Sequence, residues 1–271
     1  MSTPIFPYIC PLCNKTLAYN GKSYVCPNKH LFDVSKSGYV NLLPVNKKNS
    51  INPGDNKEMI NARVAVMDSG YYKSLADCII DLLAVYAPKS ILDAGCGIGY
   101  LTNRLHQAFP SSQLLGTDIS KYAINSASKQ YKDIPFAVAS SNSFPIESES
   151  VDAIVCAFAP VFSEEFLRIL TARGVFVRVI PGAKHLLNLK AKLYDNPTLN
   201  EPDAEEIEGF DFIKSVTVVD TFNAKNNAEL VSLVQMTPYF YHVKKSSLDV
   251  LSLIPSLIVG QEFDVRLYIH K

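Results

Sequence analysis

Four residues near the start of the chain have the types and spacing that suit a metal ion. Two residues separate Cys10 from Cys13, and Cys26 and His30 follow, which gives the pattern C-x2-C-x12-C-x3-H. Cysteines at this spacing can direct both sulfurs into one tight turn, and a histidine nitrogen can complete a tetrahedral zinc shell. The pattern favours a zinc ribbon over disulfides or ordinary buried thiols. Because four protein ligands leave no open position, we expect the zinc to be structural.

The residues around these ligands are expected to form two hairpins. KTLAYNGKSYV reads as strand, turn and strand, with Asn20-Gly21 as the turn. LFDVSKSGYVNLLPV is expected to form a second hairpin that closes the module. A module of about 40 residues is too small to fold on its own core, so bound zinc would supply the missing stability. The polar segment 47–55 is expected to be a linker, or a loop that touches substrate.

A second group of residues suits a nucleotide-containing cofactor. Residues 90–99 read SILDAGCGIG, an apolar strand that ends at Asp93 and a glycine loop that precedes a helix. A further strand, QLLGTDIS, ends at Asp118, whose carboxylate can accept hydrogen bonds from two ribose hydroxyls. An acid before the glycines would repel a pyrophosphate, but it suits the positive sulfur and ammonium group of S-adenosylmethionine. The charge therefore favours a methyl donor over a nicotinamide dinucleotide.

Alternating helices and strands must position these groups. Residues 56–87 are expected to form two helices with a break at Gly70, and strands are expected at 136–140, 151–158, 211–223 and 261–270, and at the end of EEFLRILTARGVFVRVIPG. This order predicts an α/β, Rossmann-like class I methyltransferase domain with a mostly parallel seven-stranded sheet. Ligands of such sheets bind beyond the carboxyl ends of the strands, where Ser141 and residues 157–160 also fall. The expected boundaries are 1–46 for the zinc ribbon, 47–88 for a linker and helical segment, and 89–271 for the methyltransferase domain.

Composition and charge limit the class of protein. The 271 residues are 48% hydrophobic and 19% charged, which suits a globular core and not a disordered chain. No stretch approaches the roughly 18 apolar residues that span a bilayer, and neither a signal peptide nor a secreted cysteine framework is evident, so a cytoplasmic location is expected. The net charge is zero, but residues 1–50 hold six lysines and a single acid, Asp33. This excess is either an ordinary solvated surface or a contact surface for an anionic polymer.

Several motifs together resemble those of the large-subunit ribosomal RNA guanine-N1 methyltransferases of the RlmA type. They are CPLC, CPNKHLFDVSKSGYVNLLPV, PGD, ILDAGCGIGY, VASS, AFAP, PGAKHLLNLK and LVQMTPY, and they extend over nearly the whole chain. The resemblance implies S-adenosylmethionine-dependent methylation of guanine N1 in a hairpin loop of 23S ribosomal RNA. In some relatives this modification protects against macrolides such as tylosin.

The resemblance also implies a set of site residues. The zinc ligands are the four residues named above. The cofactor contacts are Tyr72, Asp93, Gly95, Gly97, Ile98, Gly99, Tyr100, Asp118 and His185. The carboxylate that many methyltransferases carry after the third strand, where it binds the adenine amine, is replaced here by Ser140-Ser141-Asn142, which leaves the recognition of adenine open.

The reaction sets further requirements. Methyl transfer is an in-line displacement, so guanine N1 must be unpaired, turned into a pocket and aligned behind the methyl group. The N1 proton needs an acceptor, and the candidates are Asp152, His185 and the backbone carbonyls of residues 157–160. Asp152, at the start of the fourth strand, is more typical of a residue with a role in the fold, and His185 suits a cofactor contact better than a base. Phe158 suits either stacking on the guanine or packing in the core.

Two other functions fit parts of the sequence. A small-molecule methyltransferase would have no use for the zinc module and its lysines. A zinc-ribbon RNA-binding protein with an inactive methyltransferase fold would not need the intact Asp93, Gly97 and Asp118. The expected partner is a hairpin of 23S ribosomal RNA, which the zinc module helps to bind. No membrane partner is expected, and a homodimer stays open.

Overall fold

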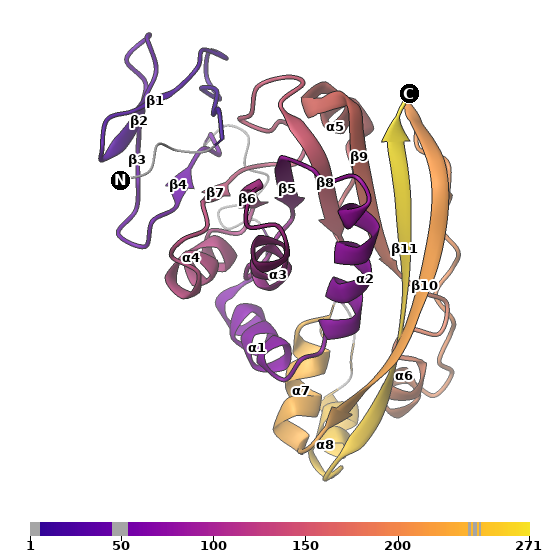
Figure 1. The fold of residues 1–271 in the computed structure, drawn as a ribbon. Helices are drawn as coiled ribbons and strands as arrows, with labels where there is room; N and C mark the ends of the chain where they lie inside the picture. The colour runs from indigo at the N-terminus through magenta and orange to yellow at the C-terminus, as the bar shows by residue number, and fades with distance from the viewer. Residues whose placement is uncertain (1–5, 45–53, 238–239, 241–242, 244) are drawn as a thin grey trace.

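The computed structural model describes residues 6–44, 54–237, 240, 243 and 245–271 (Figure 1). The junction predicted at residues 46 and 47 lies outside the described residues, as do Lys47 and Lys48 of the expected linker. Gly54 and Asp55, which end the PGD motif, are described. Among the described residues no helix combines the length and the apolar character that crossing a membrane requires.

The N-terminal ribbon is a small antiparallel sheet of β1 (Ala18–Tyr19), β2 (Ser23–Val25) and β3 (Leu31–Asp33), in the order β1-β2-β3. The turn between the first two strands lies where the sequence predicts it, but its register differs by one residue. The backbone N–H of Asn20 donates a hydrogen bond to the carbonyl of Ser23 at 3.1 Å. Gly21 and Lys22 are therefore the two central residues of the turn. Gly21 has a φ of +94°, which only glycine adopts without strain, and the Asn20 side chain accepts hydrogen bonds from the N–H groups of Lys22 and Ser23.

The second hairpin predicted for the ribbon is only partly present. Val34 and Val40 form one isolated antiparallel bridge, so the chain does turn back. However, β4 (Val40–Asn41) pairs in parallel with β7 (Phe136–Val138), at the edge of the large sheet. The predicted closing hairpin is therefore reduced to this single bridge, because β4 forms its strand pairing with a segment roughly a hundred residues later in the chain.

The large sheet has eight strands in the order β10-β11-β9-β8-β5-β6-β7-β4. The seven predicted strands are all present, and β4 is the eighth. The pairs β9–β11 and β11–β10 are antiparallel, and the other pairs are parallel. The remaining strands are β5 (Ser90–Ala94), β6 (Gln113–Asp118), β8 (Val151–Ala157), β9 (Leu170–Pro181), β10 (Phe210–Ala224) and β11 (Leu257–His270).

The helices lie on both faces of this sheet (Figure 1). The predicted break near Gly70 separates the first two, and Gly70 has a φ of +85°. Asn56 caps the first helix, because its side chain accepts a hydrogen bond from the N–H of Met59 at 3.0 Å. The helices are α1 (Lys57–Asp68), α2 (Lys73–Ala84), α3 (Tyr100–Ala108), α4 (Lys121–Gln130), α5 (Ser163–Ile169), α6 (Leu187–Leu193), α7 (Asn227–Gln235) and α8 (Lys245–Ser252).

The sheet divides the interior into two cores. Successive side chains of a strand point to opposite faces, so Ile91 and Leu92 of β5 enter different clusters. Ile91 packs with residues of α1 to α4, whereas Leu92 packs with residues of α5 and with the buried side chains of the ribbon, Phe6, Tyr8, Cys10, Leu17, Tyr24 and Cys26. The ribbon therefore covers part of one face of the sheet and shares a hydrophobic core with it.

Hydrogen bonds also fix the ribbon to the segment that follows β7. The N–H of Ile9 donates to the carbonyl of Pro145 at 3.0 Å, and the Thr16 hydroxyl donates to Glu147 at 2.8 Å. Arg168 of α5 holds the same segment from the other side, since its guanidinium donates to the carbonyls of Phe144 and Ile146. The ribbon is thus attached both through packing and through a defined set of backbone contacts.

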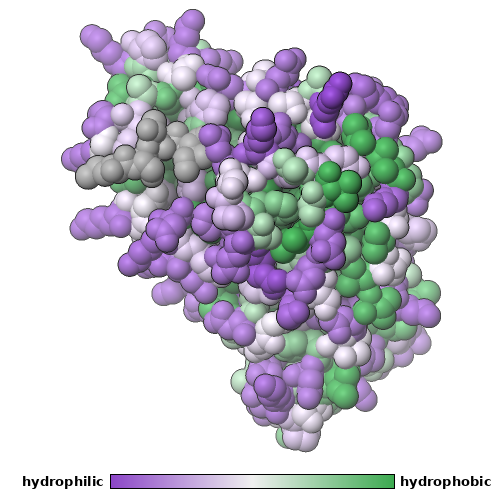
Figure 2. Space-filling view, viewed as in Figure 1, coloured by the Kyte–Doolittle hydropathy of each residue, from purple (hydrophilic) through white to green (hydrophobic). Residues whose placement is uncertain are grey.

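The two edges of the large sheet differ in character. Figure 2 shows hydrophobic residues grouped on the right of the view, where Figure 1 places β10 and β11. Ile213, Val219 and Ile258 of these strands are exposed. At the opposite edge, where β4 joins the sheet, the ribbon exposes Lys15 and Lys29. A partner that is attracted by positive charge would therefore meet the ribbon edge.

Candidate metal centre and cofactor cavity

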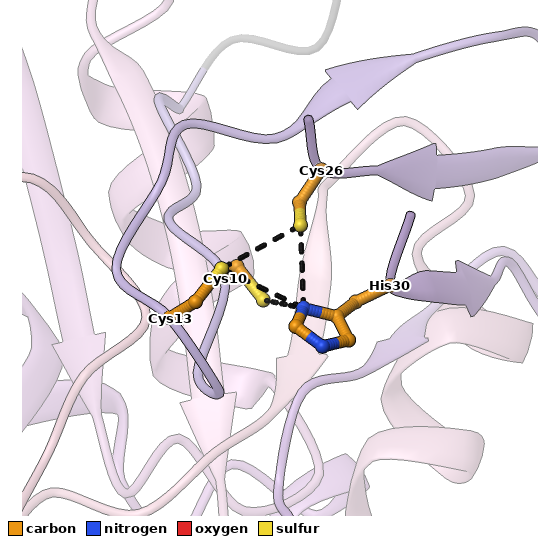
Figure 3. A group of neighbouring side chains, drawn as sticks. All are labelled: Cys10, Cys13, Cys26 and His30. Atoms are coloured by element: carbon orange, nitrogen blue, oxygen red, sulfur yellow. Dashed lines mark hydrogen bonds between the residues drawn. The ribbon is translucent and has the colours of Figure 1, made fainter. Parts of the chain in front are cut away.

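The four predicted metal ligands converge on one point (Figure 3). The sulfurs of Cys10, Cys13 and Cys26 lie 3.4, 3.5 and 3.3 Å from Nδ1 of His30. The sulfurs of Cys13 and Cys26 are 3.6 Å apart, and all four ligand atoms lie within 4.8 Å of one another. The structure therefore brings together the residues that the sequence pattern selects, and it identifies Nδ1 as the histidine ligand atom.

These separations match a tetrahedral zinc site. With Zn–S of about 2.3 Å and Zn–N of about 2.05 Å, the edges of a tetrahedron are about 3.8 Å between sulfurs and about 3.6 Å between sulfur and nitrogen. The observed contacts of 3.3–3.6 Å are slightly shorter than these edges. Zinc would hold the two pairs of ligands together, and with four protein ligands it would keep no position for a substrate.

Tight turns set the direction of the ligands. The carbonyl of Cys10 accepts hydrogen bonds from the N–H groups of Cys13 and Asn14, and the carbonyl of Cys26 accepts one from the N–H of Lys29. Asn14 and Lys29 each end their turn in the left-handed region, with φ of +57° and +65°. Each turn thus directs its ligands toward the same side, as the knuckle spacing predicts.

A cavity of about 930 Å³ lies at the carboxyl ends of β5, β6, β7 and β8. This is the edge of a parallel sheet at which ligands bind. Seven of the nine expected cofactor residues line the cavity, whereas Gly99 and His185 are not among its lining residues. The seven are Tyr72, Asp93, Gly95, Gly97, Ile98, Tyr100 and Asp118.

The three glycines of the loop after β5 have positive φ angles, but they serve different purposes. A side chain on Gly97 would meet no atom within 4 Å, so the backbone there faces open space. A Cβ on Gly95 would lie 2.5 Å from Cβ of Ala159, and one on Gly99 would lie 2.9 Å from the ring of Phe136. Gly97 therefore allows a ligand to approach, whereas Gly99 allows α3 to pack on the sheet, which explains why it does not line the cavity.

Two carboxylates line the cavity, Asp93, which is buried, and Asp118, which is half-buried. Asp93 accepts a hydrogen bond from the Thr102 hydroxyl at 2.6 Å, and burial raises the pKa of its carboxyl to about 7. Asp118 accepts from the N–H of Gly97 at 2.9 Å and from the N–H of Ser120 at 2.7 Å, and burial also raises its pKa. Asp118 thus holds the glycine loop in place in addition to facing the cavity, a role that the sequence does not reveal.

The loop before α1, which contains the end of the PGD motif, and α1 itself supply charged cavity residues, of which no motif predicts Arg63. Asp55 and Arg63 line the cavity and form an ion pair, with Oδ2 and Nε 2.6 Å apart. The carbonyl of Asp55 accepts a hydrogen bond from the Ser120 hydroxyl at 2.8 Å, which fixes the loop beside the end of β6. The expectation that this segment touches a ligand is consistent with the cavity, since Gly54 and Asp55 both line it. The cavity contains three carboxyl groups against one guanidinium, which suits a cationic ligand.

Neither side chain that the chemistry suggests as a proton acceptor lines the cavity. Asp152 lies near the amino end of β8, where it accepts hydrogen bonds from the N–H of Lys89 and the hydroxyl of Thr171. Because the cavity lies at the carboxyl end of the same strand, the structure assigns Asp152 a role in the fold. Residues 157–160, whose carbonyls are the remaining candidates, do line the cavity.

His185 is buried one layer behind the cavity wall. Its Nδ1 accepts a hydrogen bond from the N–H of Glu262 at 3.2 Å, and its Nε2 lies 3.5 Å from the Tyr71 hydroxyl. Burial lowers the pKa of His185 to about 4, so the imidazole is neutral near pH 7. Its ring packs on Phe263, which in turn contacts Tyr72 of the cavity wall. His185 therefore supports the wall and does not itself line the cavity.

The ligand geometry predicts one zinc ion per chain. Replacing Cys13 by serine should release the metal and lower the midpoint of thermal unfolding of the whole chain, because the ribbon shares a core with the large sheet. Metal analysis and calorimetry of the purified protein measure both quantities. Cys78→Ser is the control, since Cys78 lies on α2 outside the cluster and its replacement should leave the zinc content unchanged. A wild-type protein without zinc would contradict the prediction.

Comparison with known proteins identifies both parts of the chain. A family model described as the N-terminal zinc ribbon of RlmA matches residues 8–51, and a methyltransferase domain model matches residues 91–174. These ranges contain the four converging metal ligands and the glycine loop with the carboxylates of Asp93 and Asp118. The Cys3His ribbon and the class I methyltransferase fold are therefore both confirmed.

Three curated relatives extend this similarity beyond the two models. The chain is 31% identical to the "23S rRNA (guanine(748)-N(1))-methyltransferase" of Streptomyces fradiae, over 66% of this chain and 65% of the relative. It is 29% identical to the "Putative 23S rRNA (guanine-N(1)-)-methyltransferase" of Micromonospora griseorubida, over 71% of this chain and 72% of the relative. It is 30% identical to the "Putative 23S rRNA (guanine-N(1)-)-methyltransferase YxjB" of Bacillus subtilis, over 94% of each chain. Because this last similarity extends through the ribbon, the helical segment and the sheet, the chain belongs to the RlmA-type 23S rRNA (guanine-N1)-methyltransferase family.

Proposed function

We propose that this protein transfers the methyl group of S-adenosylmethionine to N1 of a guanine in a hairpin loop of 23S ribosomal RNA. The observation that carries the proposal is the fixed attachment of a lysine-bearing zinc ribbon beside an acidic cavity at the carboxyl ends of the strands. The cavity suits a cationic methyl donor, and the ribbon suits a polyanion. The names of the curated relatives state the same reaction for those proteins.

The residues of the cavity fit the proposed cofactor. When bound, S-adenosylmethionine supplies an electrophilic methyl group on a positively charged sulfur. The carboxylate of Asp118 can accept hydrogen bonds from ribose hydroxyls, and Gly97 leaves the space in which a ligand can approach the backbone. Asp93 contributes negative charge at the centre of the site. The protein itself must orient the base, exclude water and accept the N1 proton, for which the backbone carbonyls of residues 157–160 are the candidates in the cavity wall.

The raised pKa of Asp93 predicts that cofactor affinity depends on pH. A bound cation favours the ionised carboxylate, so below about pH 7 binding must also release a proton. Affinity should therefore weaken by up to about tenfold for each pH unit below 7 and level off above it. Calorimetric titrations with S-adenosylmethionine between pH 5.5 and 8.5 measure this dependence. The Asp93→Asn variant should bind S-adenosylmethionine more weakly, and its affinity should no longer fall below pH 7 for this reason. If the variant showed the same pH dependence as the parent, the attribution of that dependence to Asp93 would be contradicted.

The central experiment is the methylation of 23S ribosomal RNA with a labelled cofactor, followed by mapping of the modified base. We expect one guanine to gain a methyl group at N1, where it blocks base pairing and stops primer extension. Asp118→Ala should weaken cofactor binding by about 1.5–3 kcal/mol, because charge-assisted hydrogen bonds are removed, and activity should fall with it. Asp133→Ala is the matched control, since Asp133 is exposed and does not line the cavity. Methylation of another atom, or of small molecules alone, would refute the proposal.

The ribbon is proposed to hold the RNA backbone. Its lysines at positions 15, 22, 29 and 36 are exposed, and within the described part of the chain none of them forms an ion pair. Phosphate contacts position a nucleic acid without reading its sequence, and they weaken as salt increases. The ribbon would thus determine how tightly the RNA binds, whereas the cavity would determine which base reacts.

Neutralising three of these lysines tests that division. The combined variant Lys15→Gln, Lys22→Gln, Lys29→Gln should raise the KM for RNA, and its salt dependence should become less steep by about one unit of slope for each phosphate that the variant no longer binds. Cofactor affinity should stay unchanged, because no ribbon residue between positions 6 and 44 lines the cavity. Lys184→Gln, Lys192→Gln, Lys225→Gln is the control, with the same change of charge on exposed residues far from the ribbon. Equal KM values across a salt series would show that the RNA is held elsewhere.

A further inference from the structure

Phe158 has the features of a binding residue and not of a core residue. It follows β8 directly, lines the cavity and is 40% exposed. Its φ of +57° lies in the left-handed region, which is uncommon for a bulky side chain. Its backbone N–H donates to the carbonyl of Val179 at 3.0 Å, which holds this conformation. Strained backbone of this kind concentrates at functional sites, because elsewhere nothing offsets its cost.

Two further rings support Phe158 from other elements. Tyr72, just before α2, stacks on it with ring centroids 5.6 Å apart and planes at 25°. Phe263 of β11 contacts both rings, at 5.8 Å from Phe158 and 5.6 Å from Tyr72. Burial raises the pKa of Tyr72 to about 12, so its phenol stays neutral at any physiological pH. The phenyl ring of Phe158 is therefore held by rings from two separate segments while 40% of the residue stays exposed.

Phe158 lies in a different part of the cavity from Asp118 and Ser141, beside which the cofactor is expected to bind. Asp118 ends β6 and Ser141 follows β7, whereas Phe158 follows β8. In the sheet, β5 lies between β8 on one side and β6 and β7 on the other. A cavity of about 930 Å³ is near the upper end of the roughly 300–1,000 Å³ typical of ligand sites. There is consequently room at the β8 side for a second planar group beside the cofactor.

We propose that Phe158 is the surface on which the target guanine stacks, with Tyr72 as the ring that supports it. This inference rests on the proposed function, because it names the residue that holds the substrate base of the same cavity. A base that leaves its RNA stack loses stacking energy, and an aromatic side chain can replace it. Since Phe158 acts only on the base after it has turned inward, and the ribbon binds the backbone, Phe158 should affect turnover at saturating RNA more than it affects KM.

The test uses three variants of the full-length protein and the RNA target mapped in the methylation experiment. Phe158→Asn removes the ring but keeps the left-handed backbone, which asparagine tolerates. Phe158→Tyr keeps a ring of nearly the same shape. Phe212→Asn is the matched control, because Phe212 on β10 is 39% exposed and does not line the cavity. For each protein, kcat and KM for RNA, the Kd for S-adenosylmethionine and the unfolding midpoint are measured.

We expect Phe158→Asn to lower kcat by about 5- to 150-fold, the range for removing one aromatic–base stack. The KM for RNA and the Kd for the cofactor should change less than about twofold, Phe158→Tyr should keep most of the activity, and Phe212→Asn should match the parent. A Phe158→Asn variant as active as the parent would overturn the inference, and so would a parallel loss of cofactor affinity. If the parent protein itself leaves 23S ribosomal RNA unmethylated, the proposed function fails and the stacking role fails with it.

Discussion

The burial of the Asp93 carboxylate next to a second, half-buried carboxylate at the adjacent strand end is the constraint around which the rest of the molecule is arranged. Asp93 has a pKa of about 7 in the folded chain, against an ordinary value near 3.8, so the free energy of unfolding falls by on the order of 4 kcal/mol between about pH 4 and pH 7. The sign follows from the raised pKa: folding stability from this group is full below about pH 4 and declines as the pH rises to 7. The hydrogen bonds that Thr102 donates to Asp93 offset this loss of stability only in part. A bound cationic ligand would offset this loss of stability. A protein that binds such a ligand can therefore retain a buried carboxylate.

A single stretch of chain connects the metal site with this acidic cavity. Residues 136–138 form β7, which pairs with β4, and residues 140–143 line the cavity immediately afterwards. Residues 145–147 then form the hydrogen bonds to the ribbon, and Arg168 holds them from the opposite side. The ribbon is therefore fixed relative to the cavity by a few residues, which under the proposed function would set the distance between a phosphate on the ribbon and a base in the cavity. Specificity for one loop in a large RNA would follow from that fixed distance.

Local signals in the sequence predict most of this structure, and the differences arise from contacts between distant segments. The four metal ligands, the Gly70 break and the seven strands follow from spacing and periodicity. The partner of β4 does not, because a strand of two residues carries no record of which edge it joins. Asp152 and His185 have the right chemistry for proton transfer, but only the topology shows that one lies at the wrong strand end and the other behind Phe263. Asp55 ends the PGD motif, whereas Arg63 belongs to a helix without any distinctive motif, and only the fold brings the two beside Asp118.

The parallel pairing of β4 with β7 has a consequence for the order of events during synthesis on the ribosome. The ribbon strands and all four metal ligands leave the ribosome early, and they can close around zinc through local contacts alone. Val40 and Asn41 must then wait for Ala137 and Val138, roughly a hundred residues later and on the order of 5–20 s at ordinary elongation rates. During that interval the apolar face of the ribbon is uncovered. Early metal binding would keep this nascent segment in its final shape, so zinc supply during translation would influence the yield of folded protein.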